Sequence, residues 1–143
     1  MSQVGGIFTS FDIAASGLHA ERARMNVHAN NLANVNTIHD RNGENNPYRR
    51  KLIAFKPGNP TMTGSETLGV EVDNIIDDYD TDLQMRYMPN HPDADANGYV
   101  KYPNVSPTLE MVDMMVAQRA FEANLTSFEA AKQVFTGALR IIA

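Results

Sequence analysis

The residues most able to do chemistry lie in an acidic turn. Asp93, Asp95 and Asn97 place oxygen atoms at alternate positions, and Gly98 follows them, which is the first half of a calcium-binding loop. The second half does not fit, because Asn104 stands at the twelfth position, where such loops carry a bidentate glutamate. We therefore interpret the segment as a turn whose side chains bond the nearby backbone, and calcium binding stays as an alternative.

Other groups that could react are scattered along the chain. His19 and His28 would lie on opposite sides of a helix and cannot share a metal ion, and the chain contains no cysteine. The basic cluster 49–51 (Arg-Arg-Lys) would place charges on both faces of a strand, which favours a solvated or subunit-contacting role over phosphate binding. The sequence predicts no catalytic residue, no cofactor and no metal site.

Composition excludes further classes of protein. The chain has 143 residues and a net charge of −5, whereas a general nucleic-acid binder is more often basic. The N-terminus lacks the basic head and apolar run of a cleaved signal peptide, and no stretch approaches the ~18 apolar residues of a membrane span. We expect no nucleic-acid partner and no direct insertion into a bilayer.

The last third of the chain should form a long helix. Ser106 can cap it, and Pro107 suits its first position. Residues at every seventh position are bulky and apolar, and further apolar residues lie three or four positions away, which is typical of a helix that packs along another helix. The repeat consists of Met114, Phe121, Phe128, Phe135 and Ile142, with Leu125 and Leu139 beside it.

A second helix is predicted from about residue 7 to residue 35, because Phe11, Leu18, Met25 and Leu32 also recur every seven residues. It should end in the asparagine-rich stretch 30–37, since asparagine favours caps and turns.

The middle of the chain should hold short strands at 48–55, 68–76 and 83–88, joined by loops at 38–47, 56–67 and 89–105. Residues 37–56 are net basic and residues 57–105 net acidic. The sequence leaves open whether the basic and acidic strands pair with each other or join neighbouring copies.

The predicted fold class is mainly α: long N- and C-terminal helices paired as an antiparallel coiled coil, with a small β-strand and loop insert between them. The corresponding domains are 1–36, 37–105 and 106–143. Leu109, Val112 and Val116 form a second apolar stripe, with Met111 and Met115 beside it; one partner helix cannot cover both stripes, which suggests contacts with other subunits. The alternative is a small α+β monomer whose helices wrap a sheet.

Several motifs resemble a known family. The stretches 15–18 (ASGL) and 29–37 (ANNLANVNT) are similar to the N-terminal signature of rod and hook proteins of the bacterial flagellum. The stretches 47–51, 91–100, 103–105, 110–114 and 119–124 resemble the C-type proximal rod subunit of the basal body, the FlgC family of the rod and hook axial proteins. Residues 38–47 depart from the common pattern, and so does Asn90, where a glycine often precedes the His-Pro pair.

This resemblance implies a structural subunit of the proximal rod, the drive shaft of the motor, and not an enzyme. Such subunits leave the cytoplasm through the flagellar type III export apparatus without a cleaved signal peptide. They assemble helically through their terminal helices in a rod that spans the periplasm, and they transmit torque. Their partners are copies of themselves, other proximal and distal rod subunits, an adaptor subunit and the inner-membrane (MS) ring. The alternatives are a different rod or hook-junction subunit, or a calcium-binding or monomeric adaptor.

The expected assembly interface combines the two heptad seams with two asparagines of the signature. We also expect both ends of the chain to be largely disordered before assembly, since isolated helices depend on packing. The interface residues are Phe11, Leu18, Met25, Asn31, Leu32, Asn34, Met114, Phe121, Leu125, Phe128, Phe135, Leu139 and Ile142.

Overall fold

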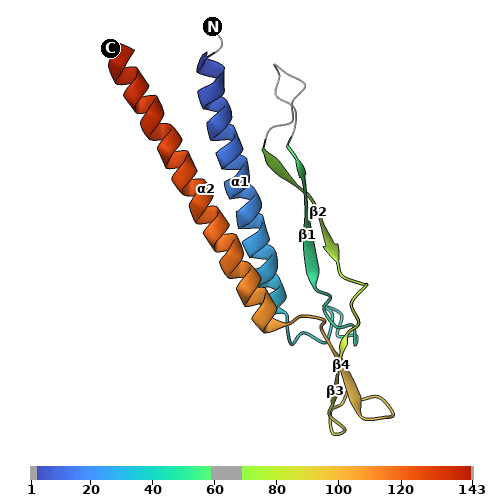
Figure 1. The fold of residues 1–143 in the computed structure, drawn as a ribbon. Helices are drawn as coiled ribbons and strands as arrows, with labels where there is room; N and C mark the ends of the chain where they lie inside the picture. Colours follow the sequence, from blue (N-terminus) through green and yellow to red (C-terminus); the bar gives the residue numbers. More distant parts are fainter. Residues whose placement is uncertain (1–2, 59–68, 143) are drawn as a thin grey trace. The chain divides into compact units, whose positions relative to one another are not determined.

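The computed structural model describes residues 3–58 and 69–142, with only the backbone of residues 3–9, 141 and 142. The described residues form two helices and four strands (Figure 1). In chain order these are α1 (Gln3–Ala33), β1 (Lys51–Pro57), β2 (Val70–Asp77), β3 (Gln84–Tyr87), β4 (Tyr99–Tyr102) and α2 (Pro107–Ile142). The chain divides into two compact units. The first unit comprises residues 1–25, 53–74 and 115–143, and the second comprises residues 26–52 and 75–114.

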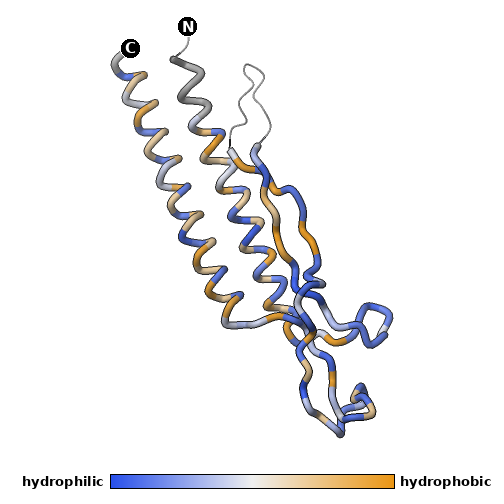
Figure 2. Tube along the Cα trace, turned by 45° about the vertical axis from the view of Figure 1, so that its right-hand side comes forward, coloured by the Kyte–Doolittle hydropathy of each residue, from blue (hydrophilic) through white to orange (hydrophobic). Residues whose placement is uncertain are grey.

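Helix α2 begins where the sequence signals predict. The backbone N–H of Glu110 donates to the carbonyl of Ser106 at 3.0 Å, and Pro107 occupies the first helical position, where its missing N–H leaves no bond unmade. Glu110 in the first turn and Arg140 in the last turn both suit the helix dipole. Figure 2 shows apolar residues recurring from turn to turn along this helix.

In the first unit the two helices run antiparallel. The Phe11 ring lies edge-on to the rings of Phe128 and Phe135, with centroid distances of 5.1 and 6.4 Å. Farther along α1, Gly17 lies against the side chain of Asn124. Residue numbers increase along α1 as those of their contact partners in α2 decrease. The aromatic contacts and the Gly17 contact therefore belong to one helix–helix packing surface.

The sheet covers another face of α1 in the first unit. The hydroxyl of Ser16 accepts a hydrogen bond from the backbone N–H of Val70 at 3.1 Å. The Arg24 guanidinium lies 4.9 Å from the centre of the Phe55 ring, a cation–π contact. Ala20 is buried, with 3% of its surface exposed. Part of the apolar surface of α1 is therefore covered by the chain itself.

Strands β1 and β2 pair with each other. The N–H of Gly58 donates to the carbonyl of Gly69, and the N–H of Asp78 donates to the carbonyl of Arg50, which is an antiparallel arrangement. The basic and acidic strands therefore belong to one sheet, and the question that the sequence left open is answered. Across the sheet, Lys56 lies 3.8 Å from Glu71 and 3.6 Å from Asp73, and Lys51 lies 2.7 Å from Asp77. These pairs are exposed, so each contributes about 0–1 kcal/mol.

Strands β3 and β4 form a second antiparallel sheet, in which Met85 lies opposite Lys101 and Tyr87 opposite Tyr99. Val100 on the other face is fully buried, and Val105 is 1% exposed. The sequence predicted a loop from 89 to 105, because prolines flank the short β4 segment. Pairing with β3 overrides that local signal, since it satisfies the backbone groups and buries Val100.

The predicted fold class, a mainly α chain with a coiled coil and a small insert, is wrong. The described residues contain two antiparallel two-stranded sheets beside the two helices, so the chain is α+β. The prediction gave the heptad repeats too much weight and the strands too little. In the structure, strands of the same chain lie against α1, through the Ser16–Val70 and Arg24–Phe55 contacts. Most of the predicted loop at 56–67 lies outside the described residues, whereas its start is the end of β1.

Gly17 gives a test of the helix packing in the first unit. A Cβ atom at this position would lie 2.8 Å from Nδ2 and 3.0 Å from Cγ of Asn124, so Gly17→Val should destabilise the chain by about 1–3 kcal/mol through overpacking. Urea unfolding of the purified chain measures this difference.

The matched control is Gly137→Val in α2, where an added Cβ would meet nothing within 4 Å. It should be neutral or slightly stabilising, because valine forms helices better than glycine. Equal effects of the two variants would contradict the packing described here.

Candidate functional site

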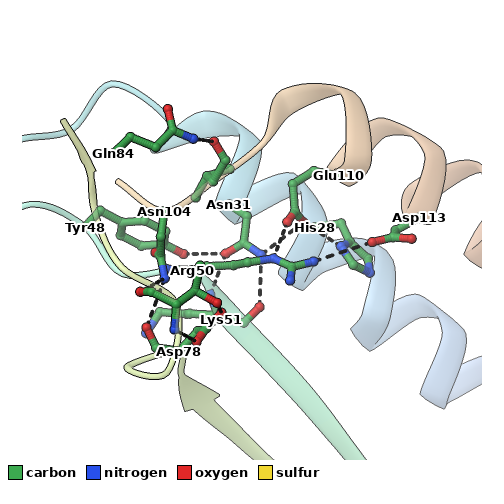
Figure 3. A network of polar contacts seen from close by, with 12 residues as sticks. His28, Asn31, Tyr48, Arg50, Lys51, Asp78, Gln84, Asn104, Glu110 and Asp113 are labelled. Carbon is green, nitrogen blue, oxygen red and sulfur yellow. Dashed lines mark hydrogen bonds and ion pairs between the residues drawn. The ribbon is translucent and has the colours of Figure 1, made fainter. Parts of the chain in front are cut away.

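The most fully buried ionisable group described is Glu110, in the first turn of α2 and within the second unit. Its side chain is 0% exposed. His28 Nδ1 lies 2.6 Å from Oε2, and Arg50 Nε lies 2.6 Å from Oε1. The Asn31 amide also donates to Oε2, at 3.1 Å. Figure 3 shows these donors converging on the carboxylate from α1 and from the start of β1.

The donors keep Glu110 ionised. Burial alone would raise the pKa of this carboxyl group, but hydrogen bonds from His28, Asn31 and Arg50, together with the Arg50 charge, outweigh it and hold the pKa below the ordinary value of 4.5. An ionised carboxylate only accepts hydrogen bonds, so the Nδ1 atom of His28 carries the proton in this contact. Arg50 also reaches Asp113, with Nη2 3.5 Å from Oδ2.

Asn31 connects the end of α1 to the start of β1. Its Oδ1 atom accepts from the Lys51 N–H at 2.8 Å and from the Tyr48 hydroxyl at 2.9 Å. Its Nδ2 atom donates to the Lys51 carbonyl at 2.9 Å. One amide side chain thus pairs with both backbone groups of Lys51, as a neighbouring strand would. Burial, and then the Asp77 and Glu110 charges, raise the pKa of Tyr48, so its hydroxyl remains a donor.

Asn104, which is 6% exposed, connects Arg50, just before β1, to the segment after β2. Its Oδ1 atom accepts from the Arg50 N–H at 2.8 Å, and its Nδ2 atom donates to the carbonyls of Asp78 and Thr81 at 3.0 and 3.2 Å. The Asp78 carboxylate accepts from the backbone N–H and the hydroxyl of Thr81. These bonds hold the pKa of Asp78 below its ordinary value of 3.8.

These contacts are structural: they hold the end of α1, the start of α2 and the residues at the start of β1 together. The Glu110 carboxylate and the amides of Asn31 and Asn104 are used up by partners of the same chain. Among the described residues, no group of three histidine or acidic side chains is placed to hold a metal ion. In the acidic turn, Asp95 Oδ1 accepts from the N–H groups of Asn97 and Tyr99, and Asp93 Oδ1 lies 3.1 Å from His39 Nε2.

The predicted interface residues fall into four groups. The seam residues Phe11, Leu18, Met25, Leu32, Met114, Phe121, Phe128 and Phe135 are half-buried, whereas Leu125 and Leu139 are 40% and 50% exposed. Asn31 is 0% exposed within the second unit, and Asn34 donates to the Asn30 carbonyl and accepts from the Thr37 hydroxyl. The side chain of Ile142 lies outside the described residues.

Sequence reasoning missed the network around Glu110, although a signal was present. Glu110 stands seven residues before Ala117, which is fully buried, so it occupies a seam position of the heptad repeat. His28 stands fourteen residues after the buried Ala14 on α1. Polar residues at seam positions of both helices predict a buried polar contact. The basic cluster, read as solvated or subunit-contacting, supplies Arg50 to that contact.

The opposite side of α2 carries exposed apolar residues near its start. Within the second unit Leu109, Met111 and Val112 are 60%, 44% and 49% exposed. We call these three residues the outer stripe. Met115 and Val116, in the first unit, are 58% and 54% exposed. Monomeric proteins rarely expose contiguous apolar surface of this kind unless it binds something.

Comparison with known proteins assigns both ends of the chain to the same class of protein. The profile of the family described as "Flagella basal body rod protein" matches residues 11–38, and that of the family described as "Flagellar basal body rod FlgEFG protein C-terminal" matches residues 96–141. The first match contains the signature 29–37 with Asn31, and the second contains β4 and Glu110. Together they indicate an axial protein of the flagellar rod class.

The relatives narrow this class to one family. The chain is 42% identical to the flagellar basal-body rod protein FlgC of Bacillus subtilis, over 94% of this chain and 97% of the relative. It is 41% identical to FlgC of Borreliella burgdorferi, over 96% and 98%, and 39% identical to FlgC of Salmonella typhimurium, over 92% and 94%. The chain belongs to the FlgC family of flagellar basal-body rod proteins, and the resemblance stated from the sequence is confirmed. Proteins of this family are structural and not enzymes. Neither described helix is long and apolar enough to cross a bilayer.

Removing the Glu110 carboxylate tests whether this network stabilises the chain. Glu110→Ala should cost about 3–5 kcal/mol of unfolding free energy, because Arg50 and His28 lose their buried partner. Urea unfolding followed by circular dichroism measures the loss. Glu129→Ala is the matched control, since Glu129 is exposed on the same helix and its removal should change the unfolding free energy by less than about 0.5 kcal/mol. A Glu110→Ala variant as stable as the control would contradict the network.

The lowered pKa of Glu110 predicts acid sensitivity. A carboxyl group whose folded pKa lies below its unfolded value stabilises the folded chain fully above the unfolded value, here about 4.5. That stabilisation is lost as the pH falls from there through the folded pKa, because protonation then favours the unfolded chain. Unfolding free energies from pH 7 to pH 3 should fall less steeply for Glu110→Gln than for the unchanged chain. Parallel curves would show that Glu110 does not carry the effect.

Proposed function

We propose that this chain is a structural subunit of the rod of the bacterial flagellar basal body, and that it assembles with further copies of itself and with other rod subunits. The observation that carries the proposal is the outer stripe of α2, exposed in a chain of a rod-protein family. Burying apolar surface stabilises a contact by about 25 cal/mol per Å², so the three large apolar side chains of the outer stripe form a strong site for inter-subunit packing.

The heptad seams have a different role in this proposal. Phe11, Phe128 and Phe135 contact one another inside the first unit, so they set the shape of the subunit, and the outer stripe makes the contacts between subunits. Leu125 and Leu139 are exposed and join the interface with the outer stripe. Asn31 and Asn34 act from within, because they fix the end of α1.

Membership of the FlgC family supports a more specific proposal about the position of the subunit. We propose that the subunit lies in the proximal rod, next to the inner-membrane (MS) ring and an adaptor subunit, and that it transmits torque through the periplasm. It would reach this place through the flagellar type III export apparatus without a cleaved signal peptide. Labelling the chain with a small epitope and locating it in purified basal bodies by electron microscopy tests this. A label at the distal rod or hook would favour another axial protein.

A charge in the outer stripe tests the assembly role. In cells that lack their own copy, Val112→Asp should abolish swimming and prevent completed basal bodies, because a desolvated carboxylate opposes packing between subunits. The purified variant should keep the circular dichroism spectrum of the unchanged chain, since Val112 is 49% exposed.

Gln118→Asp is the matched control. Gln118 is an exposed polar residue of the same helix, so this variant adds the same charge without removing apolar surface, and swimming should be largely retained. Swimming cells that carry Val112→Asp would remove the outer stripe from the proposal.

A further inference from the structure

Loop 38–47 of the second unit is held together by its own backbone. Asp40 and Glu44 pair through the N–H of Asp40 and the carbonyl of Glu44 at 3.0 Å, and the Asp40 carboxylate accepts from the N–H of Glu44 at 3.0 Å. His39 and Asn45 form an isolated antiparallel bridge. The loop therefore keeps its own shape, and its attachment to the rest of the unit depends on other contacts.

The turn at 91–98 in the same unit is also held by internal hydrogen bonds. The N–H of Ala94 donates to the carbonyl of His91 at 3.0 Å, and the Asp95 carboxylate accepts from the N–H of Asn97 at 2.8 Å. Like the loop, this turn keeps its shape without help from distant segments.

One polar contact joins the loop to the turn. Nε2 of His39 lies 3.1 Å from Oδ1 of Asp93. Within the described residues, it is the only hydrogen bond or ion pair that links residues 38–47 to a segment outside the loop. The position of the loop against the turn therefore depends on the strength of a contact between an imidazole and a carboxylate.

The second oxygen of Asp93 lacks a donor. Oδ2 is buried and accepts no hydrogen bond from the described residues. Nδ1 of His91 lies 3.4 Å away from it, but this nitrogen accepts the backbone N–H of Asp93 at 3.2 Å and carries no proton in that arrangement. Buried polar atoms without a partner are uncommon. A proton on Nδ1 of His91 would turn the nitrogen into a donor and supply the missing hydrogen bond.

We infer that His39, His91 and Asp93 form a pH-sensitive clip that fastens loop 38–47 to turn 91–98. Histidine side chains ordinarily change charge between pH 5 and pH 8, whereas carboxylates stay ionised over this range. When both imidazoles are charged, Nδ1 of His91 donates to Oδ2 and the contact from His39 to Oδ1 becomes a charge-assisted hydrogen bond. As the pH rises and the imidazoles lose their charge, the clip weakens and the loop is released.

The other charged groups around the clip keep their charge over the same range. Carboxylate, lysine and arginine side chains ordinarily do not titrate between pH 5 and pH 8, so the change in charge comes from the two histidines. The groups that line the hollows on either side of the clip are Asp40, Arg41, Arg49, Lys51 and Asp77 beside His39, and Asp95 and Lys101 beside Asp93.

The clip controls an exposed surface, because residues 41–46 at the tip of the loop are all exposed. At acidic pH this surface is held in one position, and at alkaline pH it moves as a unit about the ends of the loop. The inference goes beyond the rod assignment and does not depend on it.

A pair of spin labels tests the clip in the purified chain, which contains no native cysteine. Asn42→Cys and Asn97→Cys place one label on the loop and one on the turn, both at exposed positions. Pulsed electron paramagnetic resonance measures the distribution of distances between the labels. We expect one narrow population at pH 5.5 and a second, broad population at pH 8.0. The ratio of fastened to released loop should fall about fivefold, as expected for one partly exposed ion pair.

Asp93→Asn removes the charge but keeps the size of the side chain, so the label distances in this variant should not depend on pH. Asp82→Asn is the matched control, since Asp82 is an exposed acidic residue of the same unit, and it should keep the response of the unchanged chain. Label distances that are equal at the two pH values would overturn the inference, and so would an Asp93→Asn variant that responds as fully as the control. Because the purified chain is used, neither result bears on the rod assignment.

Discussion

The buried carboxylate of Glu110 is the constraint on which the second unit depends. A buried charge without partners is strongly unfavourable, so its burial requires His28, Asn31 and Arg50 to arrive together, from the end of α1 and the start of β1. Such an ion pair adds less net stability than an apolar contact of the same size, but it is costly to misplace. Its effect is therefore to select one register of the helix ends and the strand, which a surface made only of leucine and phenylalanine would not do.

The same constraint explains two buried asparagines, Asn31 of the signature stretch and Asn104 just before α2. Asn31 pairs with both backbone groups of Lys51, and Asn104 accepts from the Arg50 backbone while donating to two carbonyls beyond β2. The start of β1 thus receives hydrogen bonds from side chains where a sheet would supply neighbouring strands. Only an amide offers a donor and an acceptor at this spacing, so these positions require asparagine for a reason of geometry. The sequence alone suggested helix fraying at 30–37 and gave no sign of this role.

The sequence predicted the elements better than their arrangement. The heptad repeats that include Phe11 and Phe121 identified both helices. Apolar residues spaced near the helical period of 3.6 residues are a local pattern, which the sequence shows directly. The fold class failed because the sheets form through pairs distant in sequence, such as Gly58 with Gly69 and Met85 with Lys101, and a single sequence carries no direct record of them. The seam position of Glu110 was a signal for a buried polar contact, but it did not identify the partners. They come from residues 28, 31 and 50, and only the three-dimensional fold brings them together.

A rod subunit must hold its own shape and must also bind its neighbours. Different faces of the helices serve these two requirements. The seam faces inward, where Phe11 meets Phe128, so its apolar residues fix one subunit. The outer stripe stays exposed, so in the proposed function its apolar residues are left for neighbouring subunits. Were all the apolar surface covered within the chain, the subunit would be a stable monomer with no drive to assemble. Were the seam also shared between subunits, the monomer would lack a defined shape to add to a growing end. Assembly into a rod therefore needs a chain that covers some of its apolar surface and exposes the rest.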